Sequence, residues 1–216
     1  QAMYKAIDYT SLLEQEYGKD FWVYSGALLS GLPGAPSSAD VAKMDPYNPA
    51  TKAAQITEAK ALMSAAGFAD GNGVSFKIMP SGSVGAYYNQ AIRLQDQLTA
   101  IWPKMKIELA VPVDGAAFSS DSSKGNYDMI SYTAAPPPDA VSEPAQRLRT
   151  NASRNYTKFS DPQIDTMVDG IYAEFDPAAR ATKLDALRKR VEETVLNISV
   201  GKFYQVTFNQ KRIKGF

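Results

Sequence analysis

Apolar side chains recur at the spacing of an amphipathic helix in three segments of the first half of the chain. The segment 1–16 carries one such stripe. The segment 48–68 carries a second, with Gly67 at the position of a left-handed C-cap. The segment 86–101 has the same period and ends before Pro103. We therefore expect three helices here.

The segments between and after these helices have the pattern of strands instead. The segment 73–80 alternates apolar and polar residues, and the segments 106–113 and 127–135 are rich in β-branched and aromatic side chains. A Ser-rich polar segment, 114–126, is expected to form a short helix between the last two strands. Strands that alternate with helices indicate crossover connections in a mostly parallel sheet. The predicted fold class is α/β.

Two further helices are expected after the sheet. The segments 160–175 and 176–195 each begin with an Asp or Ser cap and place a proline, Pro162 or Pro177, in the first helical turn. Both carry an apolar stripe. The final apolar segment, 197–213, is expected to add one or two strands.

The composition of the chain excludes several classes of function. The 216 residues include 23 Lys+Arg and 23 Asp+Glu, so the formal net charge is zero, and 44% of the residues are hydrophobic. A nucleic-acid partner needs a basic surface and is therefore not expected. The chain has no Cys and no His, which excludes thiol nucleophiles, the usual zinc sites and Ser-His-Asp catalysis. No apolar run is long enough for a membrane span.

The remaining charged groups suggest no chemistry of their own. Arg188, Lys189, Arg190, Glu192 and Glu193 lie within one predicted helix, where a solvated face is the expected arrangement. Acidic residues near strand ends would permit glycoside hydrolysis, although such carboxylates are common in soluble domains. Glycine-rich stretches lack the spacing of a nucleotide or calcium site and indicate turns. An enzyme is not expected.

Tyrosines gather near the predicted strand ends: Tyr87, Tyr88, Tyr127, Tyr132 and Tyr156. A tyrosine can bury its ring against a ligand while its hydroxyl stays hydrogen-bonded. Ligands of α/β sheets bind where strands end, and Tyr132 lies near the end of a predicted strand, shortly before the proline run. Tyr132 is therefore the strongest candidate for a binding residue, whereas the others also fit simple packing.

Five phrases, in order along almost the whole chain, resemble the C-terminal part of the extracellular solute-binding proteins of peptide-type ABC importers. They are QAMYKAIDYTSLL, YNPATKAAQITEAKALMSAAGF, GNYDMISYTAAPPPDA, NYTKFSDPQIDTMVDGIYAEFDPAARATKLDALRKRVEET and KRIKGF. The family includes dipeptide, oligopeptide, nickel and oligosaccharide binders. The resemblance implies a lobe of a type II periplasmic binding protein, with a mostly parallel central sheet flanked by helices.

In this family the loop after the strand that ends here in YDMISYT lines the ligand cleft. The resemblance places Tyr132, Thr133 and Ala134 in that wall, with Asp139 at a later acidic position. Peptide binders pair an aspartate with the ligand's amino group, and this sequence has Ala135 there. A buried ammonium without a carboxylate is costly, so a free peptide amino terminus is disfavoured unless Asp139 replaces the missing group. The intervening prolines are expected to stiffen the wall, or alternatively only to end the strand.

The same alignment turns the loop after the first strand toward the cleft. It predicts ligand contacts from Met79, Ser81, Ser83 and Tyr87. Backbone N–H groups at the start of the next helix would suit an anionic group. The alternative is that Ser83 only caps that helix.

The resemblance implies a non-enzymatic binding component of an ABC importer. It would capture a peptide or similar small solute between two lobes and deliver it to a membrane permease. An oligosaccharide or other non-peptide solute is the alternative, with an extracellular carboxylate hydrolase a further one. No cofactor or metal is expected, and the protein is expected to be a monomer in the periplasm or anchored at the cell surface.

The domain organisation follows from the same resemblance. We expect residues 1–195 to form the second, C-terminal lobe, and residues 196–216 to form a strand that crosses back toward the first lobe. Because the sequence opens in a helical pattern, it is expected to be a piece of a longer protein whose export signal lies upstream.

Overall fold

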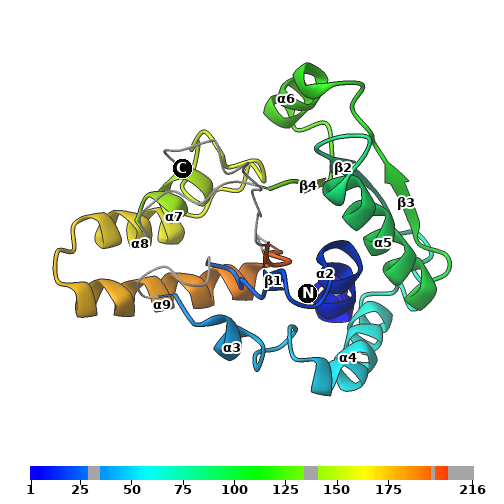
Figure 1. Cartoon of the computed structure of the whole chain (residues 1–216), viewed down its shortest axis with the longest axis horizontal. Coiled ribbons are helices and arrows are strands. Elements are labelled where there is room, and N and C mark those ends of the chain that lie inside the picture. Colours follow the sequence, from blue (N-terminus) through cyan, green and yellow to red (C-terminus); the bar gives the residue numbers. More distant parts are fainter. Residues whose placement is uncertain (29–34, 134–140, 196–197, 204–216) are drawn as a thin grey trace, which may run out of the picture.

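The computed structural model describes residues 1–28, 35–133, 141–195 and 198–203. Its helices and strands are, in chain order, α1 (Ala2–Ala6), α2 (Tyr9–Tyr17), β1 (Trp22–Val23), α3 (Ser38–Val41), the 3₁₀ helix η1 (Pro49–Thr51), α4 (Lys52–Ala65), β2 (Ser75–Pro80), α5 (Ala86–Ile101), β3 (Lys106–Leu109), α6 (Gly115–Lys124), β4 (Met129–Ser131), α7 (Ser142–Arg147), α8 (Pro162–Tyr172), α9 (Pro177–Thr194) and β5 (Lys202–Phe203). Figure 1 shows two arms, one holding β2, β3, β4, α5 and α6, and the other holding α7, α8 and α9.

A parallel three-stranded sheet organises the first arm. β2 lies in the middle and pairs with β3 and with β4, both in parallel, in the order β3-β2-β4. α5 makes the crossover from β2 to β3, and α6 makes the crossover from β3 to β4. The predicted α/β class with parallel crossovers is confirmed.

β4 is shorter than its sequence pattern predicted. Its last pair joins Ser131 to Pro80, the final residue of β2. One further backbone bond follows, in which the Ser81 N–H donates to the Ser131 carbonyl at 2.9 Å. Because the neighbouring strand ends at Pro80, Tyr132 and Thr133 leave the sheet without a ladder partner among the described residues.

The predicted helix over residues 1–16 is two helices. Ile7 has extended backbone angles (φ −64°, ψ 127°), and it separates α1 from α2. The Asp8 side chain accepts a hydrogen bond from the Ser11 N–H at 2.9 Å and so begins α2 as its N-cap. The apolar period continues across the break, which is why the pattern alone predicted one helix.

The first hydrophobic core fills the space between α1, α2, α4 and α5. Its most buried members are large: Ile7, Tyr9, Leu12, Leu13, Leu98 and Trp102. The helices predicted over 48–68 and 86–101 are confirmed as α4, with η1 before it, and as α5. Gly67 has the expected left-handed φ of 87° just after α4.

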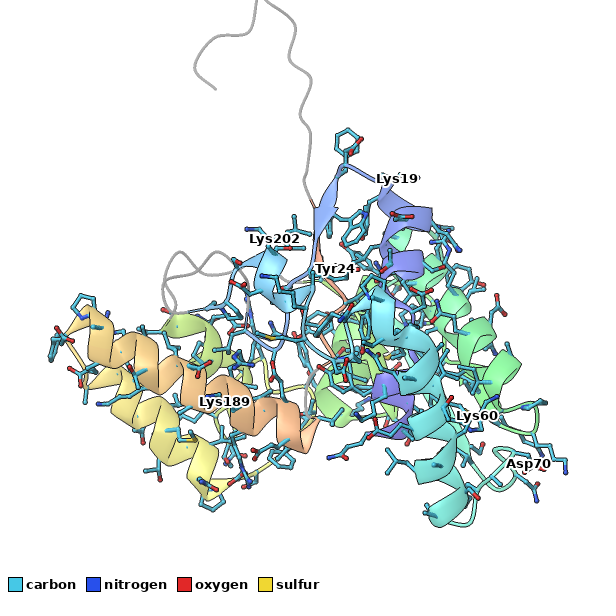
Figure 2. The ribbon with its side chains drawn as sticks, turned by 90° about the horizontal axis from the view of Figure 1, so that it is seen from below. Lys19, Tyr24, Lys60, Asp70, Lys189 and Lys202 are labelled. Carbon is cyan, nitrogen blue, oxygen red and sulfur yellow. The ribbon has the colours of Figure 1, made fainter. Side chains whose placement is uncertain are left out.

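The second core belongs to the helical arm. The Asp161 side chain caps α8 through the Gln163 N–H, the Asp176 side chain caps α9 through the Ala179 N–H, and each helix starts with a proline. The stripes predicted on these helices pack together, with contributions from neighbouring loops: Ala27, Leu28, Leu148, Ile164, Val168, Ile171, Leu184, Leu187 and Val191. Figure 2 shows Lys189 on α9 in this arm and Lys60 on α4 in the other.

The expected solvated face of α9 is partly wrong. Arg188 is only 7% exposed and donates to Asp185 at 2.7 Å and to Glu192 at 2.6 Å. Position 188 follows the buried Leu184 by four residues, so the helical period turns it inward. Two carboxylates then neutralise the buried guanidinium.

Segments from the two ends of the described chain lie side by side. β1 pairs antiparallel with β5, matching Trp22 to Phe203. The Tyr47 hydroxyl donates to the Ser199 carbonyl at 2.9 Å. The predicted final strand is thus present at residues 202–203, and its remainder lies outside the described residues. Across the described part of the chain, no helix combines the length and the apolar character needed to cross a bilayer.

Candidate functional site

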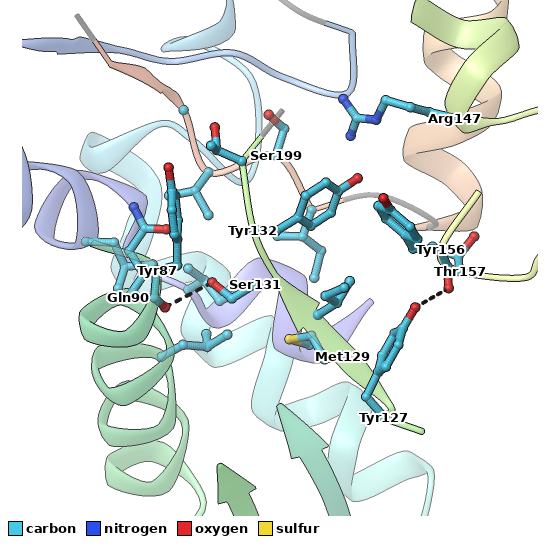
Figure 3. Close-up of a pocket in the computed structure, with 18 of the residues that line it drawn as sticks. Tyr87, Gln90, Tyr127, Met129, Ser131, Tyr132, Arg147, Tyr156, Thr157 and Ser199 are labelled. Atoms are coloured by element: carbon cyan, nitrogen blue, oxygen red, sulfur yellow. Dashed lines mark hydrogen bonds between the residues drawn. The ribbon is translucent and has the colours of Figure 1, made fainter. Parts of the chain in front are cut away.

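A cleft of about 530 Å³ opens between the two arms. One side is formed by β4 with the residues around it and by the first turns of α5. The opposite side is formed by Arg147 of α7 and the loop 154–159, and the floor by residues of α2 and of the segment 198–203. The strand β4 runs through the centre of Figure 3 and ends between these walls. The carboxyl end of a parallel strand thus faces the cleft, as expected for an α/β fold.

Tyr132 and Tyr156 meet in the middle of the cleft. Their ring centroids are 5.1 Å apart and the ring planes are 83° from parallel, so one ring presents its edge to the other. The Tyr127 hydroxyl donates to the Tyr156 carbonyl at 2.7 Å, which ties the loop 154–159 to the start of β4. Burial raises the pKa of Tyr132, so its hydroxyl stays protonated and able to donate at neutral pH.

A buried ion pair stands behind Tyr132. The Arg147 Nη1 donates to Glu143 Oε1 at 2.6 Å, four residues earlier on α7. Glu143 is 3% exposed, and burial raises the pKa of its carboxyl while Arg147 opposes that rise. The guanidinium also lies near the Tyr132 hydroxyl and, as a positive charge, acts to lower the pKa of that group. Arg147 of the helical arm therefore lies close to the end of β4 (Figure 3).

The other side of the cleft is polar and aromatic. The Ser131 hydroxyl donates to the Tyr87 carbonyl at 3.2 Å, and Gln90 Nε2 donates to the Tyr17 hydroxyl at 3.3 Å. Tyr17 stacks on Phe203, with ring centroids 4.7 Å apart. Burial raises the pKa of Tyr17 to about 12, and nearby Tyr87 adds to the rise. This side offers ring faces and neutral hydrogen-bonding groups.

Among the described residues that line the cleft, positive side chains outnumber negative ones. Arg147, Arg154 and Lys158 are positive, and Asp128 is negative. Asp128 Oδ2 already accepts the backbone N–H of Lys77 at 2.8 Å. The described walls therefore favour a negative or neutral group over a cation. Among the described residues, no group of acidic side chains is arranged to hold a metal ion.

The structure brings together three of the residues predicted from the sequence. Tyr87, Tyr132 and Thr133 all line the cleft. Their contact with a ligand stays a prediction. Ala134 and Asp139, as well as Ala135, lie outside the described residues.

The loop after β2 does not line the cleft. Met79 is 1% exposed and packs within the protein, so its side chain is not accessible to a ligand. Ser81 uses its backbone N–H to extend the β2–β4 ladder, and Ser83 is exposed outside the cleft. The expected capping by Ser83 is also absent, because the N-cap of α5 is Gly85 and no side chain bonds there.

Several lining residues did not follow from the sequence. Arg147 is on α7, a six-residue helix that was not predicted. The pair Glu143 and Arg147 at i,i+4 was the available signal, since this spacing is typical of a helical ion pair. Tyr17 and Gln90 reach the cleft through packing of α2 on α5, which no local pattern indicates.

No protein-family model and no curated protein matches the sequence. Solved structures do match. OppA of Haemophilus influenzae, in complex with the peptide RPPGFSPFR, superimposes with a TM-score of 0.77 at 16% identity, covering 94% of this chain and 38% of that chain. The periplasmic murein tripeptide binding protein MppA, in an unliganded open form, gives 0.76 at 18% identity with the same coverage. The chain has the fold of a lobe of a type II periplasmic binding protein.

A third solved structure matches over a similar share of both chains. The ABC transporter substrate binding protein CtaP of Listeria monocytogenes gives a TM-score of 0.75 at 17% identity, covering 94% of this chain and 39% of that chain. The lobe described here thus spans well under half of the length of each of these three structures. The implied fold is confirmed.

Proposed function

We propose that the chain is part of the substrate-binding component of an ABC importer. The observation that carries the proposal is the cleft of about 530 Å³ lined by tyrosines at the end of β4, in a fold shared with peptide-binding and transporter proteins. Its volume lies within the range of small-molecule sites. The solute is a peptide or a similar small molecule. The delivery partner is a membrane permease, and the location is the periplasm or the cell surface.

The cleft favours binding over hydrolysis. Glycoside hydrolysis needs two carboxyl groups on either side of the bond that is cleaved. Of the described lining residues, Asp128 is the one carboxylate, and a backbone N–H already occupies it. The chain also has no His or Cys to act as a base or nucleophile. We therefore assign no catalytic role to the cleft.

The lobe assignment for residues 1–195, with a crossover strand over 196–216, belongs to the same proposal. The pairing of β1 with β5 supports it, because it brings the segment near residue 200 back to the start of the lobe. A complete site then needs a second wall. If the whole protein binds its solute with a dissociation constant of about 1 μM, the binding free energy is near −8 kcal/mol. If each wall supplies half of this free energy, the dissociation constant of the described wall alone is in the millimolar range.

Native mass spectrometry of freshly purified full-length protein tests this function. We expect a non-covalently bound solute that is lost on denaturation. A thermal-shift screen of dipeptides, tripeptides and oligosaccharides then identifies its class, because a solute that binds only the folded state raises the melting temperature. Turnover of a peptide or glycoside substrate, or the absence of any carried or saturably bound solute, would overturn the proposal.

A further inference from the structure

Arg147 has more hydrogen-bonding capacity than its own helix uses. A guanidinium carries five N–H donors in one plane. Within the described residues, Glu143 Oε1 accepts one of them at 2.6 Å and the Tyr132 hydroxyl is a second neighbour. The same side chain lines the cleft. Among the described residues, no other oxygen accepts a hydrogen bond from Arg147, so donors remain there for a group that enters the cleft.

Glu143 holds this guanidinium in place. The carboxylate is nearly inaccessible to water, and the Arg147 side chain is 19% exposed. The ion pair fixes one edge of the planar guanidinium, so a ligand that binds the other edge loses little additional side-chain entropy. Partial burial also reduces the screening of the positive charge by water.

The surroundings agree with an anionic ligand. Arg154 and Lys158 add positive charge to the same wall, and Asp128 is engaged by the Lys77 N–H. The edge-to-face rings of Tyr132 and Tyr156 lie beside the guanidinium and supply an apolar surface. Charge and apolar surface are therefore adjacent.

We propose that Arg147 binds a carboxylate group of the transported solute, with an aromatic or aliphatic part of the same solute against Tyr132 and Tyr156. This inference rests on the proposed function and names the class of solute: a small organic acid, such as a short peptide that presents its terminal carboxylate to this wall. A carboxylate is planar and matches the guanidinium fork, so two parallel hydrogen bonds can form.

The test compares two probes of nearly the same shape, one anionic and one neutral. The full-length protein is titrated with 3-phenylpropionate and with 3-phenylpropionamide, up to about 10 mM because each probe is small and makes few contacts. Ligand-observed saturation-transfer NMR reports binding of each probe. We expect the acid to bind at least about tenfold more tightly than the amide, since a charge-assisted bidentate bond is lost in the amide.

Three variants locate the effect. Arg147→Gln removes the charge but leaves Glu143 buried without a partner, so it is paired with the double variant Glu143→Gln/Arg147→Gln, which removes both charges together. Arg149→Gln is the matched control, because Arg149 pairs with Asp169 at 3.1 Å and does not line the cleft. Circular dichroism verifies that each variant is folded.

In the wild type and in Arg149→Gln, we expect the acid to be preferred. In the double variant, we expect equal binding of acid and amide. Preference for the acid that survives in the folded double variant would overturn the assignment to Arg147. If a natural solute is carried but acid and amide bind equally to the wild type, only this inference fails. If no solute and no probe binds, the proposed function fails with it.

Discussion

The Lys52 ammonium lies among backbone carbonyls. Its Nζ donates to Ile7 O and Pro46 O at 2.7 Å each and to Gln55 Oε1 at 2.8 Å. These bonds join the end of α1 and the loop before η1 to the first turn of α4. Burial lowers the pKa of Lys52 from 10.5 to about 8, although Asp8 and Asp45 act to raise it. Loss of solvation outweighs the attraction of these two carboxylates.

A pH dependence follows from this lowered pKa. Between about pH 8 and pH 10.5 the unfolded chain keeps a proton on Lys52 that the folded chain has released. The free energy of unfolding therefore gains a contribution that rises with pH in this window. Urea denaturation at about pH 8 and about pH 9.5, compared between wild type and Lys52→Met, isolates that contribution. We expect a smaller rise in the variant, whereas Lys60→Met, on the exposed side of α4, should match the wild type.

Tyr132 carries the main prediction for binding. Its ring meets the Tyr156 ring edge to face in the cleft, near the Arg147 guanidinium. Tyr132→Ala in the full-length protein should weaken solute binding by at least about tenfold, because a central aromatic contact and a hydroxyl donor are removed together. Isothermal titration calorimetry with the identified solute measures the change. Tyr88→Ala, on α5 outside the cleft, is the control, and an unchanged dissociation constant for Tyr132→Ala would remove Tyr132 from the site.

At the residue scale, chain position indicated that Tyr132 would line the cleft. Tyr132 follows a strand end, and strand ends of parallel sheets face the ligand side. The burial of Met79 did not follow from the sequence, because Ile78, Met79 and Pro80 are all buried, so both faces of β2 are covered there and alternation carries no information. The helical period indicates that Arg188 points inward, but its charge favoured an exposed position.

At the scale of helices, local capping chemistry decides where each one begins. Asp161 and Asp176 were identified as starts because an Asp followed by proline provides both a cap and a preset backbone angle. The break between α1 and α2 has the same chemistry in Asp8, but the apolar stripe that spans it obscured the signal. β4 ends early because its partner ends, and a partner's length cannot be obtained from the strand's own residues.

The cap of α9 gives a quantitative test. The Asp176 side chain accepts the Ala179 N–H at 2.7 Å. Asp176→Ala leaves that N–H to water and should lower the free energy of unfolding by about 1 kcal/mol. Asp176→Asn keeps a capping oxygen and should stay close to wild type. Urea denaturation of the three proteins decides, and equal losses in both variants would show that the cap is not the cause.

At the scale of the whole molecule, contacts between distant segments close the fold. An ideal Cβ on Gly201 would lie 2.7 Å from Leu13 Cδ1 and 3.0 Å from the Val23 carbonyl. Leu13 is 1% exposed and has little room to move. The close approach of β5 to β1 and α2 therefore requires glycine. Nothing local in the sequence predicts this pairing, since residues 22–23 and 202–203 are far apart along the chain.

Gly201→Ala tests that close approach. We expect a loss of about 1 to 3 kcal/mol in the free energy of unfolding, because the added methyl group overpacks a filled site. Gly170→Ala is the matched control: a Cβ there meets nothing within 4 Å, and the position is inside α8. That variant should be stabilised by about 0.5 to 1 kcal/mol. Thermal and urea denaturation measure both, and a neutral Gly201→Ala would mean that β5 can shift without cost.

The ladder between β1 and β5 also sets how the lobe responds to mechanical force. The ladder has two residue pairs: Trp22 with Phe203, which we call the outer rung because the chain enters and leaves the ladder there, and Val23 with Lys202, the inner rung. The chain enters at Trp22 and leaves at Phe203, so tension on those two sides acts on the same end of the ladder. The outer rung would then separate before the inner rung, as in a zipper, instead of both resisting together in shear. A pulling measurement with its attachment points at Trp22 and Phe203 should therefore find that this pair opens at low force, before the parallel sheet yields.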